Sequence, residues 1–115
     1  MNPKNTMNAL FVCTAALQRS PTAAEIFSDI AREKKISVNV KYAGIHMLAI
    51  PRVDKELIDW ADMIYAMENI HKDFILSIAK NAGKKIKVLN IKDIYFRGAP
   101  ELKEILRKKL EKEIK

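Results

Sequence analysis

The chain has 115 residues, of which 49% are hydrophobic and 30% are charged, and its formal net charge is +7. This length and composition suit one globular domain, and we expect a single domain over residues 1–115. No stretch approaches the roughly 18 consecutive apolar residues of a membrane span, and no signal-peptide core is visible, so we expect a cytoplasmic protein without a membrane partner. One cysteine excludes an intramolecular disulfide and a cysteine-rich zinc site.

The positive charge is expected to steer anionic substrates toward the protein. Lysines and arginines are scattered beside acidic residues on the expected helices, which is the ordinary pattern of solvated helix faces. No nucleic-acid recognition motif accompanies this charge, so a nucleic-acid partner is not expected. The two histidines do not have the spacing of metal ligands, and we expect no metal site.

The first expected strand covers residues 9–12 and ends directly before the only cysteine, Cys13. Its run of large apolar side chains is typical of a buried parallel strand. Ser20 and Pro21 then indicate an N-cap and the first residue of a helix over residues 20–34. Cys13 would therefore lie at the carboxyl end of a strand, which is the edge where open α/β sheets bind ligands.

The rest of the chain alternates strand and helix patterns, and this alternation predicts a three-layer α/β/α fold with a four-stranded parallel sheet. The expected further strands are residues 37–43, 63–67 and 85–89, the expected further helices are residues 53–60, 69–82 and 100–115, and residues 1–7 are expected to be a frayed tail. Residues 37–43 alternate apolar and polar side chains, as an edge strand would. Gly83 is expected to end its helix as a C′ glycine, and Trp60 is assigned to the core.

The segment from Cys13 to Arg19 contains the parts of an anion site. A helix N-terminus offers unpaired N–H groups and a partial positive charge, and the N–H groups of a loop can surround phosphate oxygens. Arg19 adds a bidentate fork. The same field favours the thiolate form of a cysteine. The pattern predicts a nucleophile in an anion cradle, with Ser20 donating a hydrogen bond to its sulfur.

Each of these residues also has an ordinary structural interpretation. A lone cysteine after a strand is more often a small buried hydrophobe, and a lone arginine is usually a surface charge. The spacing Cys-x5-Arg-Ser-Pro favours the phosphate loop over both. The apolar loop at residues 45–52 has two open interpretations, because it would either cover the core or form a wall of the substrate cleft.

This motif directly after an apolar strand resembles the low-molecular-weight protein tyrosine phosphatases, and in particular a short predicted-phosphatase branch of that family. The resemblance extends over nearly the whole chain, to Tyr42-Ala43-Gly44, Trp60-Ala61-Asp62, Met67-Glu68-Asn69-Ile70-His71 and Asp93-Ile94-Tyr95. It implies a sheet of strand order 2-1-3-4. It also implies a hydrolase that needs no cofactor and acts on aryl phosphomonoesters, with phosphotyrosine in proteins, or a small aryl phosphate, as substrate.

The resemblance assigns a role to each residue of the expected site. Cys13 would be the nucleophile that forms a cysteinyl phosphate, Arg19 would bind the phosphoryl oxygens, and Asp93 would be the general acid. Tyr95 would form a wall for the aromatic ring. The phosphate, or another oxyanion, would be bound by Thr14, Ala15, Ala16, Leu17, Gln18, Arg19 and Ser20.

The loop departs from the family pattern Cys-x-Gly-Asn-x-x-Arg-Ser at Ala15 and Ala16. Alanine cannot brace the loop as the asparagine side chain does, and a left-handed alanine costs about 1 kcal/mol. Two alternatives therefore stand beside the enzyme: a phosphate-binding module without turnover, and a phosphocarrier, against which Arg19 counts. The thiol-linked arsenate reductases that share the fold need further cysteines, which this chain lacks.

Overall fold

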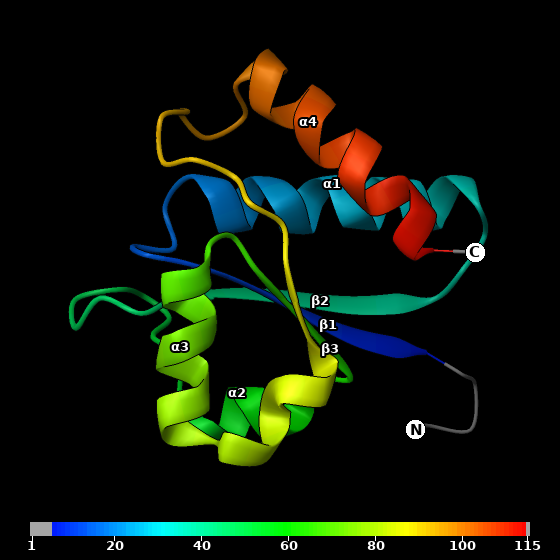
Figure 1. Ribbon diagram of the computed structural model, residues 1–115. Coiled ribbons are helices and arrows are strands. Elements are labelled where there is room, and N and C mark those ends of the chain that lie inside the picture. The colour runs from blue at the N-terminus through cyan, green and yellow to red at the C-terminus, as the bar shows by residue number, and fades with distance from the viewer. Residues whose placement is uncertain (1–5, 115) are drawn as a thin grey trace.

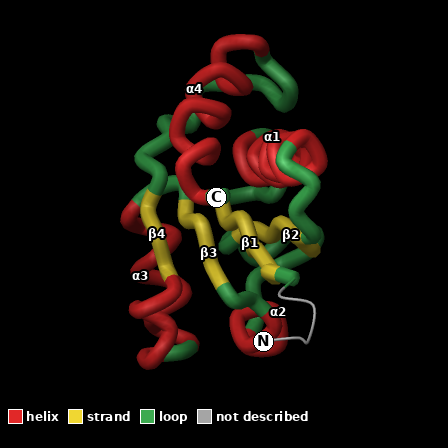
Figure 2. The backbone as a smooth tube through the Cα atoms, turned by 90° about the vertical axis from the view of Figure 1, so that its right-hand side faces the viewer, coloured by secondary structure: helices red, strands yellow, loops and turns green. Residues whose placement is uncertain are grey.

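The computed structural model describes residues 6–114. Four parallel strands form one sheet in the order β2-β1-β3-β4, with helices on both faces (Figures 1 and 2). The elements are β1 (Met7–Cys13), α1 (Arg19–Glu33), β2 (Val38–Gly44), α2 (Lys55–Trp60), β3 (Met63–Ala66), α3 (Asn69–Ile78), β4 (Ile86–Val88) and α4 (Pro100–Leu110), with 3-10 segments at Lys80–Lys85 and Glu111–Glu113. The predicted fold class and strand order are confirmed. Within this part of the chain no helix is long and apolar enough to cross a bilayer.

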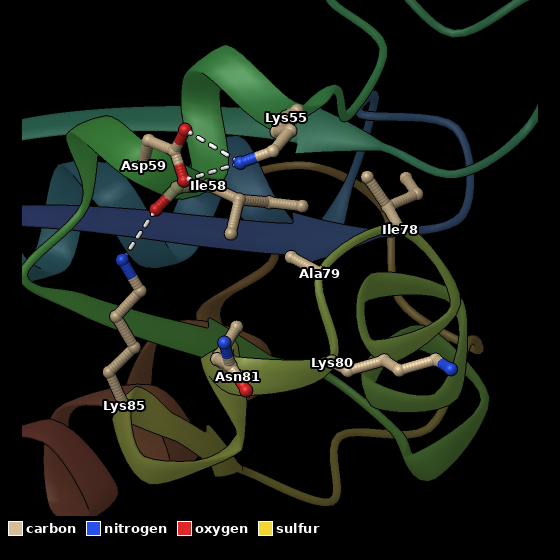
Figure 3. A pocket seen from close by; sticks show the side chains of 9 residues that line it. Lys55, Ile58, Asp59, Ile78, Ala79, Lys80, Asn81 and Lys85 are labelled. Atoms are coloured by element: carbon tan, nitrogen blue, oxygen red, sulfur yellow. Dashed lines mark hydrogen bonds and ion pairs between the residues drawn. The ribbon is translucent and has the colours of Figure 1, made fainter.

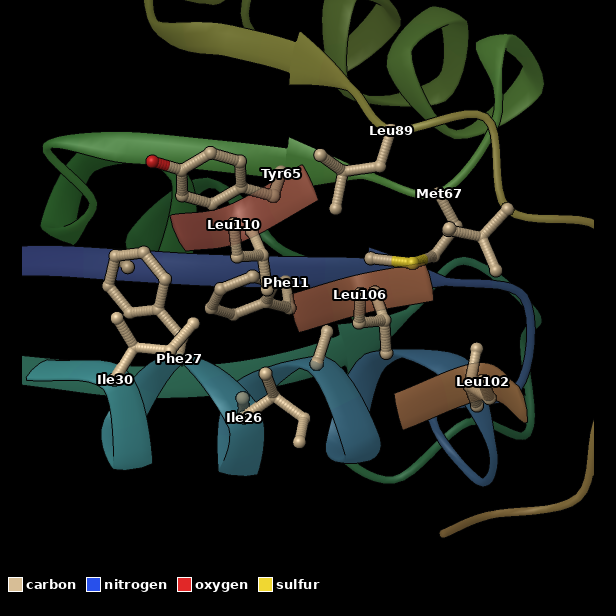
Figure 4. Packing of buried hydrophobic residues seen from close by; sticks show 14 of the residues in the cluster. Phe11, Ile26, Phe27, Ile30, Tyr65, Met67, Leu89, Leu102, Leu106 and Leu110 are labelled. Carbon is tan, nitrogen blue, oxygen red and sulfur yellow. The ribbon is translucent and has the colours of Figure 1, made fainter. Parts of the chain in front are cut away.

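The strand β1 lies between β2 and β3, and helices on both sides of the sheet bury its two faces from Ala9 to Cys13. Ala9, Phe11 and Cys13 belong to the core beneath α1 and α4, whereas Leu10 and Val12 belong to the core beneath α2 and α3. In the first core (Figure 4), the Phe11 ring stacks on Tyr65 with centroids 5.0 Å apart and meets Phe27 edge-on at 5.4 Å. This packing fixes the end of β1, and with it Cys13.

Two predictions about helix ends are wrong. The helix α1 begins at Arg19 with Gln18 at its N-cap, so Ser20 is the second helical residue and does not cap it. Its hydroxyl lies 3.0 Å from the Cys13 sulfur instead. The helix α3 ends at Ile78, and Gly83 lies inside the following 3-10 segment without a positive φ, so it is not a C′ glycine.

Three smaller expectations also need correction. Met7 pairs with Val38 in the sheet and Thr6 is buried, so neither belongs to a frayed tail, and residues 1–5 lie outside the described residues. Trp60 is only half-buried at the edge of a core, with the Lys41 ammonium above its ring. The last helix ends at Leu110, and the change to a 3-10 turn lets Ile114 enter the core. The other bounds shift by a residue or two, and β2 is an edge strand, as predicted.

Candidate active site

Cys13 lies at the carboxyl end of β1 and lines a hollow of about 70 Å³. Its thiol is almost fully buried, and Ser20 Oγ lies 3.0 Å from the sulfur, as the sequence predicts. The lining consists of Cys13, Thr14, Ala15, Leu17, Gln18, Arg19 and Asp93. A drug-sized ligand needs a cleft of roughly 300–1,000 Å³, so this hollow suits a group of a few atoms.

The loop after β2 holds the backbone of the phosphate loop in place. The carbonyl of Cys13 accepts a hydrogen bond from the Ile45 N–H at 3.1 Å, and the carbonyl of Thr14 accepts one from the His46 N–H at 2.9 Å. Because C=O and N–H point in opposite directions across a trans peptide, the N–H groups that follow turn away from this loop. Gly44 permits the approach, since a Cβ there would lie 2.5 Å from the Thr14 carbonyl oxygen.

The N–H groups of residues 14–18 have no hydrogen-bond partner within the part of the chain that the structure describes. Within residues 6–114, none of these five groups donates a hydrogen bond to another group of the chain. The loop also contains Ala16 in the left-handed region at φ 62°, the strained position that the family pattern indicates for the missing asparagine. The segment thus presents unpaired donors in succession, directly before the positive end of the α1 dipole.

Arg19 is the most buried charge near the hollow, with only 1% of the residue exposed. One guanidinium nitrogen, Nη1, donates to the Glu68 carboxylate and to the Ile91 carbonyl, the latter at 2.7 Å. Nη2 lies 3.4 Å from Thr14 Oγ1, and Nε lies 3.7 Å from Asp93 Oδ1. Contacts from three other segments therefore hold the guanidinium in one orientation.

Glu68 and His71 begin α3 and support the loop from behind. They form a capping box, in which the Glu68 N–H donates to His71 Nδ1 at 3.0 Å. The other ring nitrogen, Nε2, lies 3.0 Å from Thr14 Oγ1. Burial, followed by the nearby Arg19 charge, lowers the pKa of His71 to about 4, so the ring is neutral at pH 7. The sequence analysis assigned neither Glu68 nor His71 to the site, although Glu-x-x-His at the start of a helix was a signal.

The segment after β4 brings Asp93 to the hollow. Its carboxylate is 63% exposed, and the segment is attached to the start of α1, where Gln18 Oε1 accepts from the Arg97 N–H and Thr22 Oγ1 accepts from the Gly98 N–H. Tyr95 is half-buried against the core and does not line the hollow. Ala16 and Ser20, which are both buried, are also absent from its lining.

An apolar rim adjoins the hollow. A second depression, of about 210 Å³, is lined by Ala15, Leu17, His46, Leu48, Ala49 and Ile50. Leu17 is 63% exposed, and only Ala49 among the apolar residues from 46 to 50 is buried. The loop at residues 45–52 therefore does not mainly cover the core. No group of three His, Cys, Asp or Glu side chains within residues 6–114 is arranged to hold a metal ion.

Comparison with known proteins gives consistent relatives, although no family model matches the chain. A protein-arginine-phosphatase of Bacillus subtilis (strain 168) is 29% identical, over 95% of this chain and 97% of that protein. The solution structure of a low molecular weight protein tyrosine phosphatase from Bacillus subtilis matches with a TM-score of 0.72 and 28% identity, over 92% of this chain and 98% of that one.

A structure of the YwlE arginine phosphatase, a mutant with a phosphorylated active-site serine, matches with a TM-score of 0.72 and 26% identity, over 93% of this chain and 95% of that one. These relatives are phosphatases of one fold, and their alignments cover nearly the whole of this chain. The resemblance found in the sequence is thereby confirmed: the chain is related to the low-molecular-weight protein tyrosine phosphatases in both sequence and fold.

Proposed function

We propose that the chain is a protein phosphatase that binds a phosphoryl group in the hollow at Cys13 and transfers it to the cysteine sulfur. One observation carries the proposal: Cys13, Arg19 and four residues of the loop between them line a hollow of about 70 Å³, and the N–H groups of this loop have no hydrogen-bond partner within residues 6–114. The relatives support it, because they are phosphatases and one of them has a phosphorylated side chain in its active site.

The proposed reaction has two steps. The Cys13 thiolate attacks phosphorus, an S–P bond forms, and the P–O bond to the leaving group breaks as Asp93 gives that oxygen a proton. Water then attacks the cysteinyl phosphate, Asp93 takes a proton from it, and phosphate leaves with the thiolate restored. Arg19 and the loop N–H groups stabilise the equatorial oxygens throughout, and Ser20 donates to the departing sulfur.

Phosphotyrosine in proteins is the first proposed substrate, with small aryl phosphates as simpler ones. The hollow accommodates a phosphoryl group, so the rest of the substrate lies on the rim, where exposed Leu17 offers an apolar surface to an aromatic ring. Several further apolar side chains beside it favour a macromolecular substrate over a small polar one. Tyr95 remains the proposed wall only for the part of the substrate beyond the hollow.

Phosphoarginine in proteins is the second candidate, because one relative is a protein-arginine-phosphatase. The exposed Asp93 carboxylate at the edge of the hollow is a suitable acceptor for a guanidinium. Leu17 favours the aromatic ring of phosphotyrosine instead, because its side chain has no hydrogen-bond acceptor for a guanidinium. Two peptides of identical flanking sequence, one with phosphotyrosine and one with phosphoarginine, decide between the candidates through the ratio of their kcat/KM values.

The experiment that tests the proposed activity is hydrolysis of p-nitrophenyl phosphate at several pH values. Wild type is expected to turn over, Cys13→Ser to lose activity completely, and Asp93→Ala to lose about 10²–10⁴-fold. Asp59→Ala, which removes an exposed carboxylate remote from the hollow, is the control and should behave as wild type. A folded wild type that binds vanadate without turnover would favour the binding module. A stable phosphocysteine that releases no phosphate would favour the carrier.

The binding-module alternative has its own test in the loop. Substitution of Ala15 by glycine and Ala16 by asparagine introduces the family residues at the strained position. If the two alanines prevent turnover, the double variant should gain activity over wild type in the same assay. An unchanged rate would exclude the loop composition as the reason for low activity.

A further inference from the structure

The position of the proton on His71 follows from its hydrogen bonds. Nδ1 accepts from the backbone N–H of Glu68 at 3.0 Å, and a backbone N–H can only donate. The buried ring is neutral at pH 7, so its single proton is on Nε2. The Nε2–H group therefore donates to Thr14 Oγ1, which lies 3.0 Å away.

The Thr14 hydroxyl consequently faces two donors. Arg19 Nη2, at 3.4 Å, is the second group that donates to the same oxygen. A hydroxyl has two acceptor lone pairs and one proton, so with both lone pairs engaged the proton must point away from His71 and Arg19. Within the described residues no group accepts that proton. Thr14 supplies the only hydroxyl group among the residues that line the hollow.

We propose that Thr14 donates a hydrogen bond from its hydroxyl to a phosphoryl oxygen of the substrate, and that His71 is the positioning residue that fixes the direction of this bond. The role rests on the proposed function and deepens it, because it adds an oriented side-chain donor to the backbone N–H groups and to Arg19. The hydrogen bond from the Glu68 N–H to Nδ1 also explains why the buried ring is neutral. In a charged ring Nδ1 would carry a proton, and two N–H donors would face each other.

Two variants of Thr14 test the donor. Thr14→Val removes the hydroxyl and keeps the shape of the side chain, whereas Thr14→Ser keeps the hydroxyl. With orthovanadate as the probe, Thr14→Val should weaken binding by about 10- to 100-fold, the usual value of a hydrogen bond to a charged group. The kcat/KM for p-nitrophenyl phosphate should fall by a similar factor. Thr14→Ser should stay within about 3-fold of wild type in both measurements.

Nuclear magnetic resonance tests the positioning residue independently of activity. The ¹⁵N shifts of His71 at pH 7 should show a protonated Nε2 and an unprotonated Nδ1, with the exposed His46 as the internal control. If Thr14→Val does not fold, His71→Gln and His71→Leu replace it. Glutamine keeps an N–H donor toward Thr14, so its vanadate affinity should exceed that of the leucine variant by about 3-fold or more.

The possible failures are distinguishable. Three results would each overturn the role of Thr14 and His71 without affecting the proposed phosphatase activity. They are an unchanged vanadate affinity in Thr14→Val, equal vanadate affinities of the two His71 variants, and a proton on Nδ1 of His71. Unchanged vanadate affinity with altered alkylation of Cys13 by iodoacetamide would assign the hydroxyl to the sulfur and also overturn the role. A wild type that neither binds vanadate nor hydrolyses p-nitrophenyl phosphate would overturn the proposed function, and this role with it.

Discussion

Two hollows of this molecule differ in size and in the groups that line them, and the smaller one contains the candidate nucleophile and the buried arginine. The larger, of about 370 Å³, lies between α2, the end of α3 and the 3-10 segment that follows, and is shown in Figure 3. Two of its three lysines have local or backbone partners: Lys55 pairs with Asp59 one helical turn later, and Lys85 donates to the carbonyls of Ile58 and Ala61. These contacts end or brace a helix.

The hollow at Cys13 has the opposite character. Its cation, Arg19, is held by Glu68, Ile91 and Asp93, which are 49 or more residues away in the sequence, and a nucleophile lies beside it. The N–H groups of the adjoining loop, residues 14–18, have no partner within residues 6–114. Between these two, volume would favour the larger hollow, whereas buried charge and unpaired donors favour the smaller. The following predictions test this contrast, each with a matched change elsewhere in the chain.

The largest effect is expected from exchanging the cations. Arg19→Lys should lower kcat/KM for p-nitrophenyl phosphate by about 10²–10³-fold, because lysine loses the planar fork that donates in several directions at once. Lys85→Arg in the larger hollow should leave the same constant within about 2-fold of wild type. Steady-state kinetics of both variants checks this, and a substantial loss with Lys85→Arg would contradict the assignment of function to the smaller hollow.

A pH-dependent loss of stability should follow from His71. Its pKa is about 4 in the folded protein and about 6.5 when unfolded, so the unfolded chain binds the proton first as the pH falls. Stability that is present above about pH 6.5 should therefore decrease toward pH 4, by up to roughly 3 kcal/mol in total. Urea unfolding of wild type and His71→Asn across this range isolates the contribution. The same measurement on His46→Gln is the control, and a pH dependence that persists unchanged in His71→Asn would refute the attribution.

The two ion pairs should differ in their contribution to stability. Glu68→Gln removes the charge that balances a buried arginine and should lower the free energy of unfolding by about 1–3 kcal/mol, a range reduced because Glu68 is itself 39% exposed. Asp59→Asn breaks an exposed pair at spacing i, i+4 and should change it by less than about 0.5 kcal/mol. Equal losses in urea unfolding would mean that the Arg19 network is no more coupled than a surface pair.

The smallest effect concerns backbone strain, and the sign of the stability change should differ between Ala16 in the phosphate loop and Ala79 beside the larger hollow. Ala16→Gly relieves a left-handed alanine and should stabilise the protein by about 0.5 kcal/mol after the entropy of glycine is subtracted. Ala79→Gly, at φ −139° beside the larger hollow, relieves nothing and should destabilise it by about 0.5–1 kcal/mol. Thermal unfolding of both variants measures the difference, and two losses of equal size would show that the loop at Ala16 is not strained.

The nucleophile and its cradle were predictable because their chemistry is local in the sequence. Cys13, Arg19 and Ser20 lie within one loop and the first turn of a helix, so their spacing alone indicates a shared site. Even there the detail was wrong for Ser20, which was expected to cap the helix. The helix begins one residue earlier than expected, so Ser20 lies in its first turn with its hydroxyl oxygen 3.0 Å from the sulfur.

The sequence by itself determined the order of strands and helices, the buried first strand and the position of Cys13 at its end, because periodicity, caps and motif spacing are local properties of the chain. Only the tertiary structure decided that Glu68 and His71 meet Arg19 and Thr14, that Asp93 reaches the hollow, and that Tyr95 does not line it. The physical reason is that parallel strands bring their carboxyl ends to one edge, while the register and docking of each loop depend on hydrogen bonds between segments far apart in the sequence.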